Sequence, residues 1–144
     1  MRAWIVSDIH FSKMDHFLRQ PLRIPKADVC ICAGDIANFC SDSISYLRNR
    51  IEPHMPVILT LGNHDYYSAS IEFVLDKVRR ETFGSRVHLL ENQSLEIDGY
   101  RFVGATLWTD FCVPVGNDEH IPPEERKVLA YSLVPSQIAD YYNI

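Results

Sequence analysis

The stretch from Pro56 to Asp65 reads PVILTLGNHD, an apolar run that ends at a glycine and then turns polar. Two earlier stretches have the same form, AWIVSDIH at residues 3–10 and ADVCICAGD at residues 27–35. A short, continuous apolar run is typical of a strand that is buried on both faces of a parallel sheet. The three stretches therefore predict three buried strands, each followed directly by a polar loop.

Helical patterns separate these strands. Residues 41–52 favour one helix, the segment between Ser68 and Gly84 favours a clearer one, and a weak pattern lies around Phe17. Serine is a preferred N-cap, proline stops a helix, and glycine commonly ends one. The first of these helices is expected to be capped by Ser41 or Ser43 and to end at Pro53. The clearer helix is expected to be capped by Ser68 or Ser70 and to end at Gly84. Its buried stripe is formed by Ile71, Val74, Leu75 and Val78.

The second half of the chain predicts further strands and one last helix. Asp98-Gly99 is a strong signal for a two-residue hairpin turn between two apolar segments. Alternating strands and helices followed by a hairpin indicate an α/β fold, a layered mixed β-sheet with flanking helices. The expected elements are strands at 87–90, 95–97, 100–103 and 105–109, and a helix over 124–142 that is interrupted at Pro135.

Composition limits the class of protein. At 144 residues we expect a single domain over residues 1–144, and the net charge of −5 argues against a general nucleic-acid surface. Cys30 and Cys32 alternate along a strand, which predicts buried thiols on one face, and the four cysteines show no zinc or disulfide spacing. No apolar run approaches the roughly 20 residues of a membrane span. We therefore expect a soluble, cytoplasmic protein.

The polar loops carry the chemistry. Asp8, Asp35 and Asn63 each follow one of the predicted strands, and they are 27 and 28 residues apart. In an α/β sheet, functional groups collect beyond the carboxyl ends of the strands, so we expect the three side chains to converge. Carboxylate, imidazole and carboxamide groups suit divalent ions such as manganese, iron or zinc. His64 could then act as a general acid, with Asp65 orienting its imidazole.

These residues resemble the motifs of the calcineurin-like metallophosphoesterase family. That family has Asp-x-His, Gly-Asp and Gly-Asn-His-Asp/Glu in this order, which match Asp8-Ile9-His10, Gly34-Asp35 and Gly62-Asn63-His64-Asp65. The resemblance implies an αββα sandwich and two divalent metal ions, and it implies hydrolysis of phosphate mono- or diesters, whether small molecules or phosphoproteins. By the same resemblance, the first ion would be bound by Asp8 and His10, the second by Asn63, and both by Asp35. His64 and Asp65 would be the catalytic residues.

The later Gly-His-x-His motif of that family does not occur in this sequence. The resemblance therefore implies a chain that holds the front part of the domain, with an incomplete second metal site and an exposed sheet that self-association or a partner would cover. The alternative is a non-catalytic metal-binding or protein-interaction remnant of the fold. We expect structural or solvated roles for the remaining histidines, which are His16, His54, His88 and His120.

Overall fold

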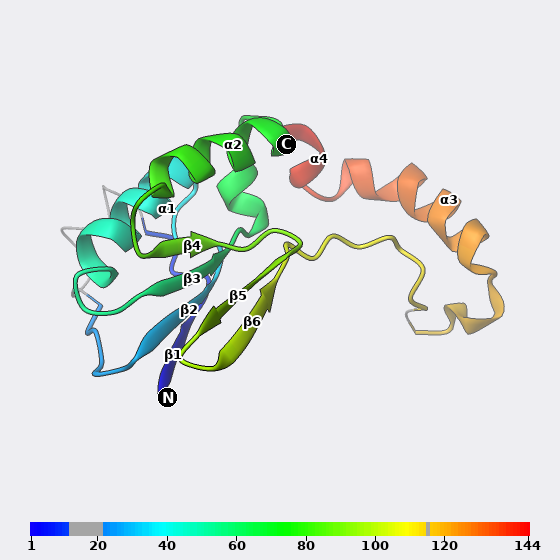
Figure 1. Cartoon of the computed structure of the whole chain (residues 1–144). Coiled ribbons are helices and arrows are strands. Elements are labelled where there is room, and N and C mark those ends of the chain that lie inside the picture. The colour runs from blue at the N-terminus through cyan, green and yellow to red at the C-terminus, as the bar shows by residue number, and fades with distance from the viewer. Residues whose placement is uncertain (12–21, 115) are drawn as a thin grey trace. The chain divides into compact units, whose positions relative to one another are not determined.

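The computed structural model describes residues 1–11, 22–114 and 116–144 (Figure 1). It forms two compact units, Met1–Thr106 and Leu107–Ile144, and each is described by itself. The first unit contains all the strands that the structure describes and all the motif residues. The expectation of a single domain over the whole chain stays a prediction.

A four-stranded parallel sheet forms the centre of the first unit (Figure 1). Neighbouring strands follow one another in the sequence, which places a crossover between each pair, as a parallel sheet requires. The sheet confirms the predicted α/β class and the three strands that precede the motifs. Its strands, in spatial order, are β1 (Ala3–Val6), β2 (Val29–Ala33), β3 (Val57–Thr60) and β4 (Val87–Leu89).

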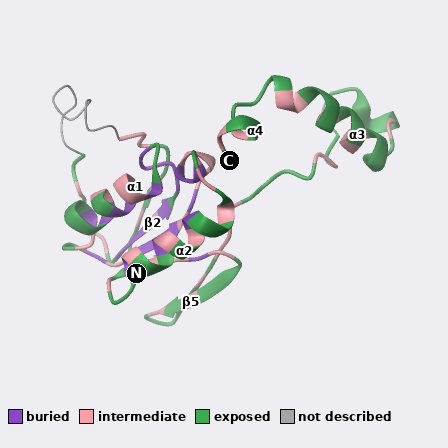
Figure 2. Ribbon diagram, turned by 90° about the horizontal axis from the view of Figure 1, so that it is seen from above, coloured by how far each residue is buried: buried purple, intermediate pink, exposed green. Residues whose placement is uncertain are grey.

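Two helices cover one face of this sheet. Helix α1 (Cys40–Tyr46) runs on into a π-helical turn (Leu47–Ile51), and α2 (Ile71–Thr82) packs beside it. The main core lies between these helices and the sheet, where Figure 2 shows most of the buried chain. Cys30 and Cys32 lie in this core with about 1% or less of their surface exposed, which confirms their prediction as buried thiols.

The helix caps were predicted correctly for α2 and wrongly for α1. Ser70 caps α2 by accepting a hydrogen bond from the backbone amide of Phe73 at 3.3 Å. Helix α1 instead begins after Phe39, whose side chain makes no capping bond. Because the helix starts earlier than expected, Ser43 falls inside its first turn and is fully buried.

A β-hairpin packs on the opposite face of the sheet. Strands β5 (Gln93–Ile97) and β6 (Tyr100–Gly104) pair in antiparallel register, and Asp98 and Gly99 both have positive φ angles, 51° and 78°. Two positive φ angles are what a type I′ hairpin turn requires, so this prediction is confirmed. The hairpin forms a two-stranded sheet of its own, and its apolar side chains contact the central sheet. The contacting residues are Val29, Ile58 and Leu90 of the sheet side, and Leu95, Ile97 and Phe102 of the hairpin.

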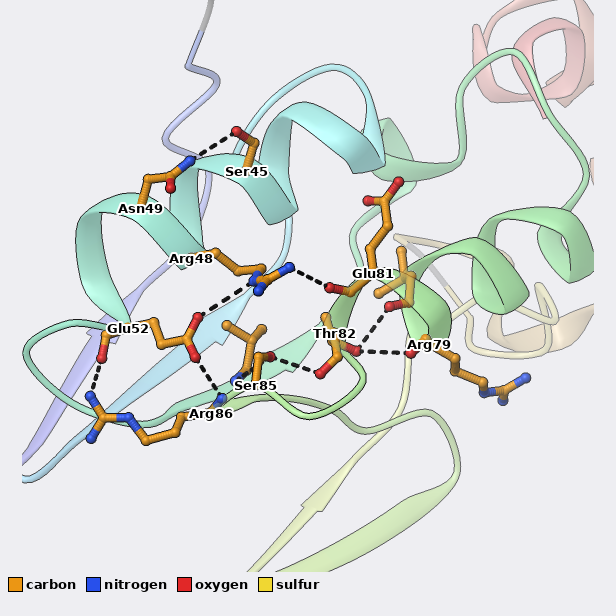
Figure 3. Close-up of polar contacts among 11 residues, drawn as sticks. Ser45, Arg48, Asn49, Glu52, Arg79, Glu81, Thr82, Ser85 and Arg86 are labelled. Carbon is orange, nitrogen blue, oxygen red and sulfur yellow. Dashed lines mark hydrogen bonds and ion pairs between the residues drawn. The ribbon is translucent and has the colours of Figure 1, made fainter.

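Polar side chains join the ends of α1 and α2 to β4 (Figure 3). Arg48 donates a hydrogen bond to the carbonyl oxygen of Glu81 at 2.9 Å and lies 3.6 Å from the Glu52 carboxylate. That carboxylate accepts a hydrogen bond from the backbone amide of Arg86 at 2.7 Å. These contacts fix the helices at the end of the sheet away from the motif loops.

The segment 105–109 is not a strand, contrary to expectation. The backbone amide of Thr106 donates to the side chain of Glu91 at 3.0 Å, where a strand would use a neighbouring backbone carbonyl.

In the second unit, the predicted interruption at Pro135 is confirmed. The helical elements that the structure describes there are a 3₁₀ turn (Asp118–His120), α3 (Pro123–Leu133), a second 3₁₀ turn (Val134–Ser136) and α4 (Asp140–Asn143).

Two further sequence predictions stay without a structural answer. The weak helical pattern around Phe17 lies in residues 12–21, outside the described residues. Ile5 of β1 and Val103 of β6 are 70% and 78% exposed, and the expected self-association or partner stays a prediction. Within the described ranges, no helix has the length and apolar character needed to cross a membrane.

Candidate metal centre

The loops after β1, β2 and β3 lie at one edge of the sheet because the three strands are parallel and adjacent. Asp8 lies two residues beyond β1, Asp35 two residues beyond β2, and Asn63 three residues beyond β3. The structure brings the side chains of Asp8 and Asp35 together at the carboxyl ends of the strands, as expected, and the convergence of the Asn63 side chain with them stays a prediction.

Backbone hydrogen bonds join the first two loops to each other. The amide of Asp8 donates to the carbonyl oxygen of Gly34 at 3.3 Å, and the amide of His10 donates to that of Asp35 at 3.0 Å. Asp8, His10 and Asp35 all adopt positive φ angles, between 47° and 54°. This left-handed conformation costs a non-glycine residue about 1–2 kcal/mol, so the surrounding contacts must impose it.

Asp8, His10 and Asp35 form the candidate metal cluster. One possible ligand atom from each lies within 4.8 Å of those from the other two. Asp35 is buried, His10 is half-buried and Asp8 is exposed, so the group opens towards solvent on the Asp8 side. Two carboxylates and one imidazole fit a divalent ion of intermediate hardness such as manganese, iron or zinc.

The third motif contacts this cluster through both backbone and side chain. Residues Asn63–Tyr66 form a 3₁₀ turn, and the amide of His64 donates to Oδ1 of Asp35 at 3.0 Å. The imidazole of His64 meets that of His10 edge to face, with ring centroids 4.7 Å apart. The structure thus places His64 beside the cluster.

The carboxylate of Asp65 does not orient the imidazole of His64, contrary to expectation. Its Oδ2 accepts hydrogen bonds from the amides of Asp35 and Gly62, each at 3.0 Å, and its Oδ1 accepts one from the Ser43 hydroxyl at 2.6 Å. Among the described residues, Nδ1 of His64 has no hydrogen-bond partner. Asp65 is only 1% exposed, and this burial raises its pKa against the lowering effect of its hydrogen bonds. Its hydrogen bonds join the loops of the second and third motifs to each other and to α1.

Ser43 is a site residue that the sequence reasoning missed. Its hydroxyl donates to Asp65 and also accepts a hydrogen bond from the backbone amide of Ala37 at 3.0 Å. Ser43 was one of the two serines expected to cap α1. Its position inside the first turn of the helix places it in contact with Asp65 of the third motif instead. A serine beside the apolar Ile44 gives no distinctive sequence signal, so only the fold reveals this role.

Two glycines are required by close backbone approach. A Cβ atom on Gly34 would lie 2.1 Å from the backbone nitrogen of Gly62, and one on Gly62 would lie 2.3 Å from Oδ1 of Asp35. Both distances are shorter than those that Cβ atoms make with non-bonded atoms in protein structures. The glycines of the second and third motifs therefore let the two loops touch.

The candidate metal cluster includes none of the remaining histidines that the structure describes. His54 is exposed, His88 is half-buried on β4, and His120 is exposed with its Nδ1 2.7 Å from the carbonyl oxygen of Asn117. His16 lies outside the described residues. Among the residues that the structure describes, the candidate cluster contains no histidine other than His10.

The family model described as calcineurin-like phosphoesterase matches residues 1–129. The chain belongs to the calcineurin-like phosphoesterase family. The match covers all three motifs, the sheet and both helices of the first unit, and it confirms the resemblance drawn from the sequence. A search of curated proteins finds no match. The phosphoesterase family is one of hydrolases that use divalent metal ions, and the cluster of Asp8, His10 and Asp35 is a potential metal site of this kind.

Proposed function

We propose that this chain is a metal-dependent hydrolase of phosphate mono- or diesters whose first metal ion is held by Asp8, His10 and Asp35. The observation that carries the proposal is the convergence of these three side chains beside His64 in a member of the phosphoesterase family. When bound, divalent ions in such sites activate water and stabilise the charge that develops on the phosphate oxygens.

Electrostatics supports the need for a cation. The carboxylates of Asp8 and Asp35 would repel an anionic phosphoester, and the chain carries a net charge of −5. A divalent ion at the cluster would offset the charge of these two carboxylates. The same residues would therefore hold the metal, and the loaded site would no longer repel the substrate.

The residues of the third motif have distinct roles in the proposal. His64 contacts the substrate phosphate and donates a proton to the leaving-group oxygen. Asn63 and Asp35 would hold a second ion, to which Asn63 would supply its carboxamide oxygen. Asp65 holds the backbone of both motifs in place. The substrate, the identity of the metals and the cytoplasmic location expected from the sequence stay predictions.

Hydrolysis of bis-p-nitrophenyl phosphate and p-nitrophenyl phosphate with added Mn²⁺ tests the proposal. We expect metal-dependent turnover that Asp35→Asn reduces by at least about 100-fold, since outer partners alone contribute 10–100-fold and a ligand contributes more. Asp76→Asn removes the same charge from an exposed position on α2 and should keep the wild-type rate. Turnover that survives Asp35→Asn would refute the assignment of the site.

A second candidate function is a non-catalytic module that binds a single metal ion. It is favoured by the small cluster, because within the described residues only Asp8, His10 and Asp35 form a group of three candidate ligands of the carboxylate, thiol or imidazole type. Metal content per chain separates the two functions. About two ions with turnover supports the hydrolase, whereas one ion without turnover supports the module.

A further inference from the structure

The hydroxyl of Thr106 contacts the residues on both sides of the third motif. Its Oγ1 donates to the carbonyl oxygen of Leu61 at 2.9 Å, and Leu61 directly precedes the motif. The same Oγ1 lies 3.0 Å from the hydroxyl of Tyr66, which directly follows the motif. A threonine hydroxyl has one proton, so while Thr106 donates to Leu61 it accepts from Tyr66. One side-chain oxygen therefore joins the two ends of the motif turn.

The carboxylate of Glu91 orients Thr106. Its Oε2 accepts a hydrogen bond from the backbone amide of Thr106 at 3.0 Å and lies 2.9 Å from the hydroxyl of the same residue. Contacts with both the backbone and the side chain limit the positions that the hydroxyl can take. Glu91 lies two residues beyond β4, Thr106 two residues beyond β6, and Leu61 directly after β3. The hydroxyl of Thr106 therefore joins the segments that follow three different strands.

A close approach of these strand ends supports the same arrangement. A Cβ atom on Gly104, the last residue of β6, would lie 2.6 Å from Cβ of Leu90 and 2.8 Å from Cγ2 of Thr60. Because glycine has no side chain, the end of β6 can pack directly against the ends of β3 and β4. This packing brings Thr106 within reach of Leu61.

The third motif in turn holds Asp35 of the candidate metal cluster. The backbone amide of His64 donates to Oδ1 of Asp35, and Oδ2 of Asp65 accepts from the backbone amide of Asp35, both at 3.0 Å. A shift of the motif turn would therefore move the Asp35 carboxylate as well as the imidazole of His64. Hydrogen bonds to a metal ligand commonly set its orientation and the affinity of the site.

We propose that Thr106 is a positioning residue of the metal site, whose hydroxyl, oriented by Glu91, closes the third motif turn and so holds the Asp35 carboxylate and the imidazole of His64. The inference rests on the proposed function for its effect on metal binding and catalysis, but the closing of the turn can be measured in the metal-free protein. Thr106→Val keeps the branched side chain and removes the hydroxyl, whereas Thr106→Ser keeps the hydroxyl.

Hydrogen exchange of backbone amides, followed by NMR of the metal-free protein, tests the closing of the turn. The amides of Gly62 and His64 are hydrogen-bonded to Asp65 and Asp35, so their exchange reports the opening of the motif. We expect both amides to exchange about 10-fold faster in Thr106→Val, since a hydrogen bond that keeps the turn closed is lost, and at the wild-type rate in Thr106→Ser. Wild-type exchange of both amides in Thr106→Val would overturn the proposal.

Thr82→Val is the matched control. It also removes a buried threonine hydroxyl, which donates to the carbonyl oxygen of Val78 at 2.8 Å at the far end of α2. This variant should speed exchange of the Cys30 amide in β2, because that amide reports the opening of the whole core, and should leave the His64 amide unchanged. Should Thr106→Val fail to fold, Glu91→Ala, which removes the carboxylate that orients the hydroxyl, gives the same comparison.

Calorimetric titration with Mn²⁺ tests the link from the turn to the metal cluster. We expect Thr106→Val to weaken binding about 10-fold, at the lower end of the range for groups that orient a ligand. Thr106→Ser should restore the affinity, and Thr82→Val should bind as the wild type does. Wild-type affinity in Thr106→Val would overturn the role of Thr106 in positioning the cluster.

Kinetics separates this inference from the proposed function. With turnover present, Thr106→Val should lower kcat about 10-fold while KM changes less, because His64 acts in the transition state, and Thr106→Ser should restore kcat. If the wild type shows no turnover but Thr106→Val speeds exchange of the His64 amide and weakens Mn²⁺ binding, the hydrolase proposal fails and the positioning role stands. If turnover is present and Thr106→Val keeps the wild-type kcat, the positioning role fails and the hydrolase proposal stands.

Discussion

The side chain of Asp65 accepts a hydrogen bond from the backbone amide of Asp35 at 3.0 Å. This contact joins the third motif to the second one. A second contact joins the same two motifs, because the amide of His64 donates to the carboxylate of Asp35. Asp35 is therefore held by hydrogen bonds at its backbone amide and at its carboxylate. Ser43 completes the arrangement by donating to Asp65.

The first prediction concerns this buried network. Asp65→Asn replaces an acceptor oxygen by an amide nitrogen and leaves at least one buried donor unsatisfied, so we expect the free energy of unfolding to fall by about 2–3 kcal/mol. Ser43→Ala should cost about 1–2 kcal/mol, because the amide of Ala37 loses its partner. Urea denaturation measures both.

Ser45→Ala is the matched control for Ser43→Ala. Ser45 lies in the same helix, is exposed, and bonds only the side chain of Asn49 among the hydrogen bonds described for it. Its substitution should change the free energy of unfolding by no more than about 0.5 kcal/mol. Equal losses for the two serine variants would contradict a special role for Ser43.

The second prediction concerns the contact between the motif glycines. Gly34 and Gly84 have similar positive φ angles, 82° and 72°, but a Cβ on Gly84 would meet nothing within 4 Å. Gly84→Ala should therefore cost only the conformational strain of about 1–2 kcal/mol. Gly34→Ala adds a clash with Gly62 and should lower the free energy of unfolding by more than about 3 kcal/mol, as thermal or urea denaturation would report. Similar losses at both positions would show that the loops separate easily.

The third prediction concerns the pH dependence of stability. Burial raises the pKa of the Cys30 thiol to about 12 from its ordinary value of 9.0, and it raises the pKa of Cys32 as well. Both thiols are protonated in the folded and unfolded chain below pH 9.0, so their contribution is fully present there. Above that pH the unfolded chain loses protons that the folded chain keeps, and the free energy of unfolding falls as the pH approaches about 12.

Cys30→Ala tests this dependence by urea denaturation at a series of pH values. The variant should be less stable than the wild type near neutral pH, and its stability should fall less steeply above pH 9.0 because one buried thiol is missing. Ser45→Ala removes an exposed hydroxyl and no thiol, and it should keep the wild-type slope. Parallel curves for the wild type and Cys30→Ala would contradict the raised pKa.

Much of the fold followed from local patterns. Continuous apolar runs predicted β1, β2 and β3, the Ser70 cap and the apolar stripe predicted α2, and Asp98-Gly99 predicted the hairpin turn. Each signal is local, since it depends on residues that are neighbours in sequence. The segment 105–109 was predicted wrongly because Thr106 finds its partner in the side chain of Glu91, which an apolar pattern does not reveal.

The site was partly predictable for a similar reason. Asp8, His10, Asp35 and His64 follow strands whose ends meet in any parallel sheet, so strand topology alone brings them together. The role of Asp65 could not be predicted, because it depends on which buried donors its carboxylate meets after folding. Ser43 was missed because its contacts depend on where α1 begins.

The most direct measurement is an anomalous difference map from crystals soaked in Zn²⁺. The account predicts a peak bonded to one side-chain atom each of Asp8, His10 and Asp35, at about 2.0–2.2 Å as is usual for zinc with nitrogen and oxygen ligands. The map should lose this peak in Asp35→Asn and keep it in Asp76→Asn. A map with no peak at these three residues, or with its strongest peak at other side chains, would contradict the metal centre on which the account rests.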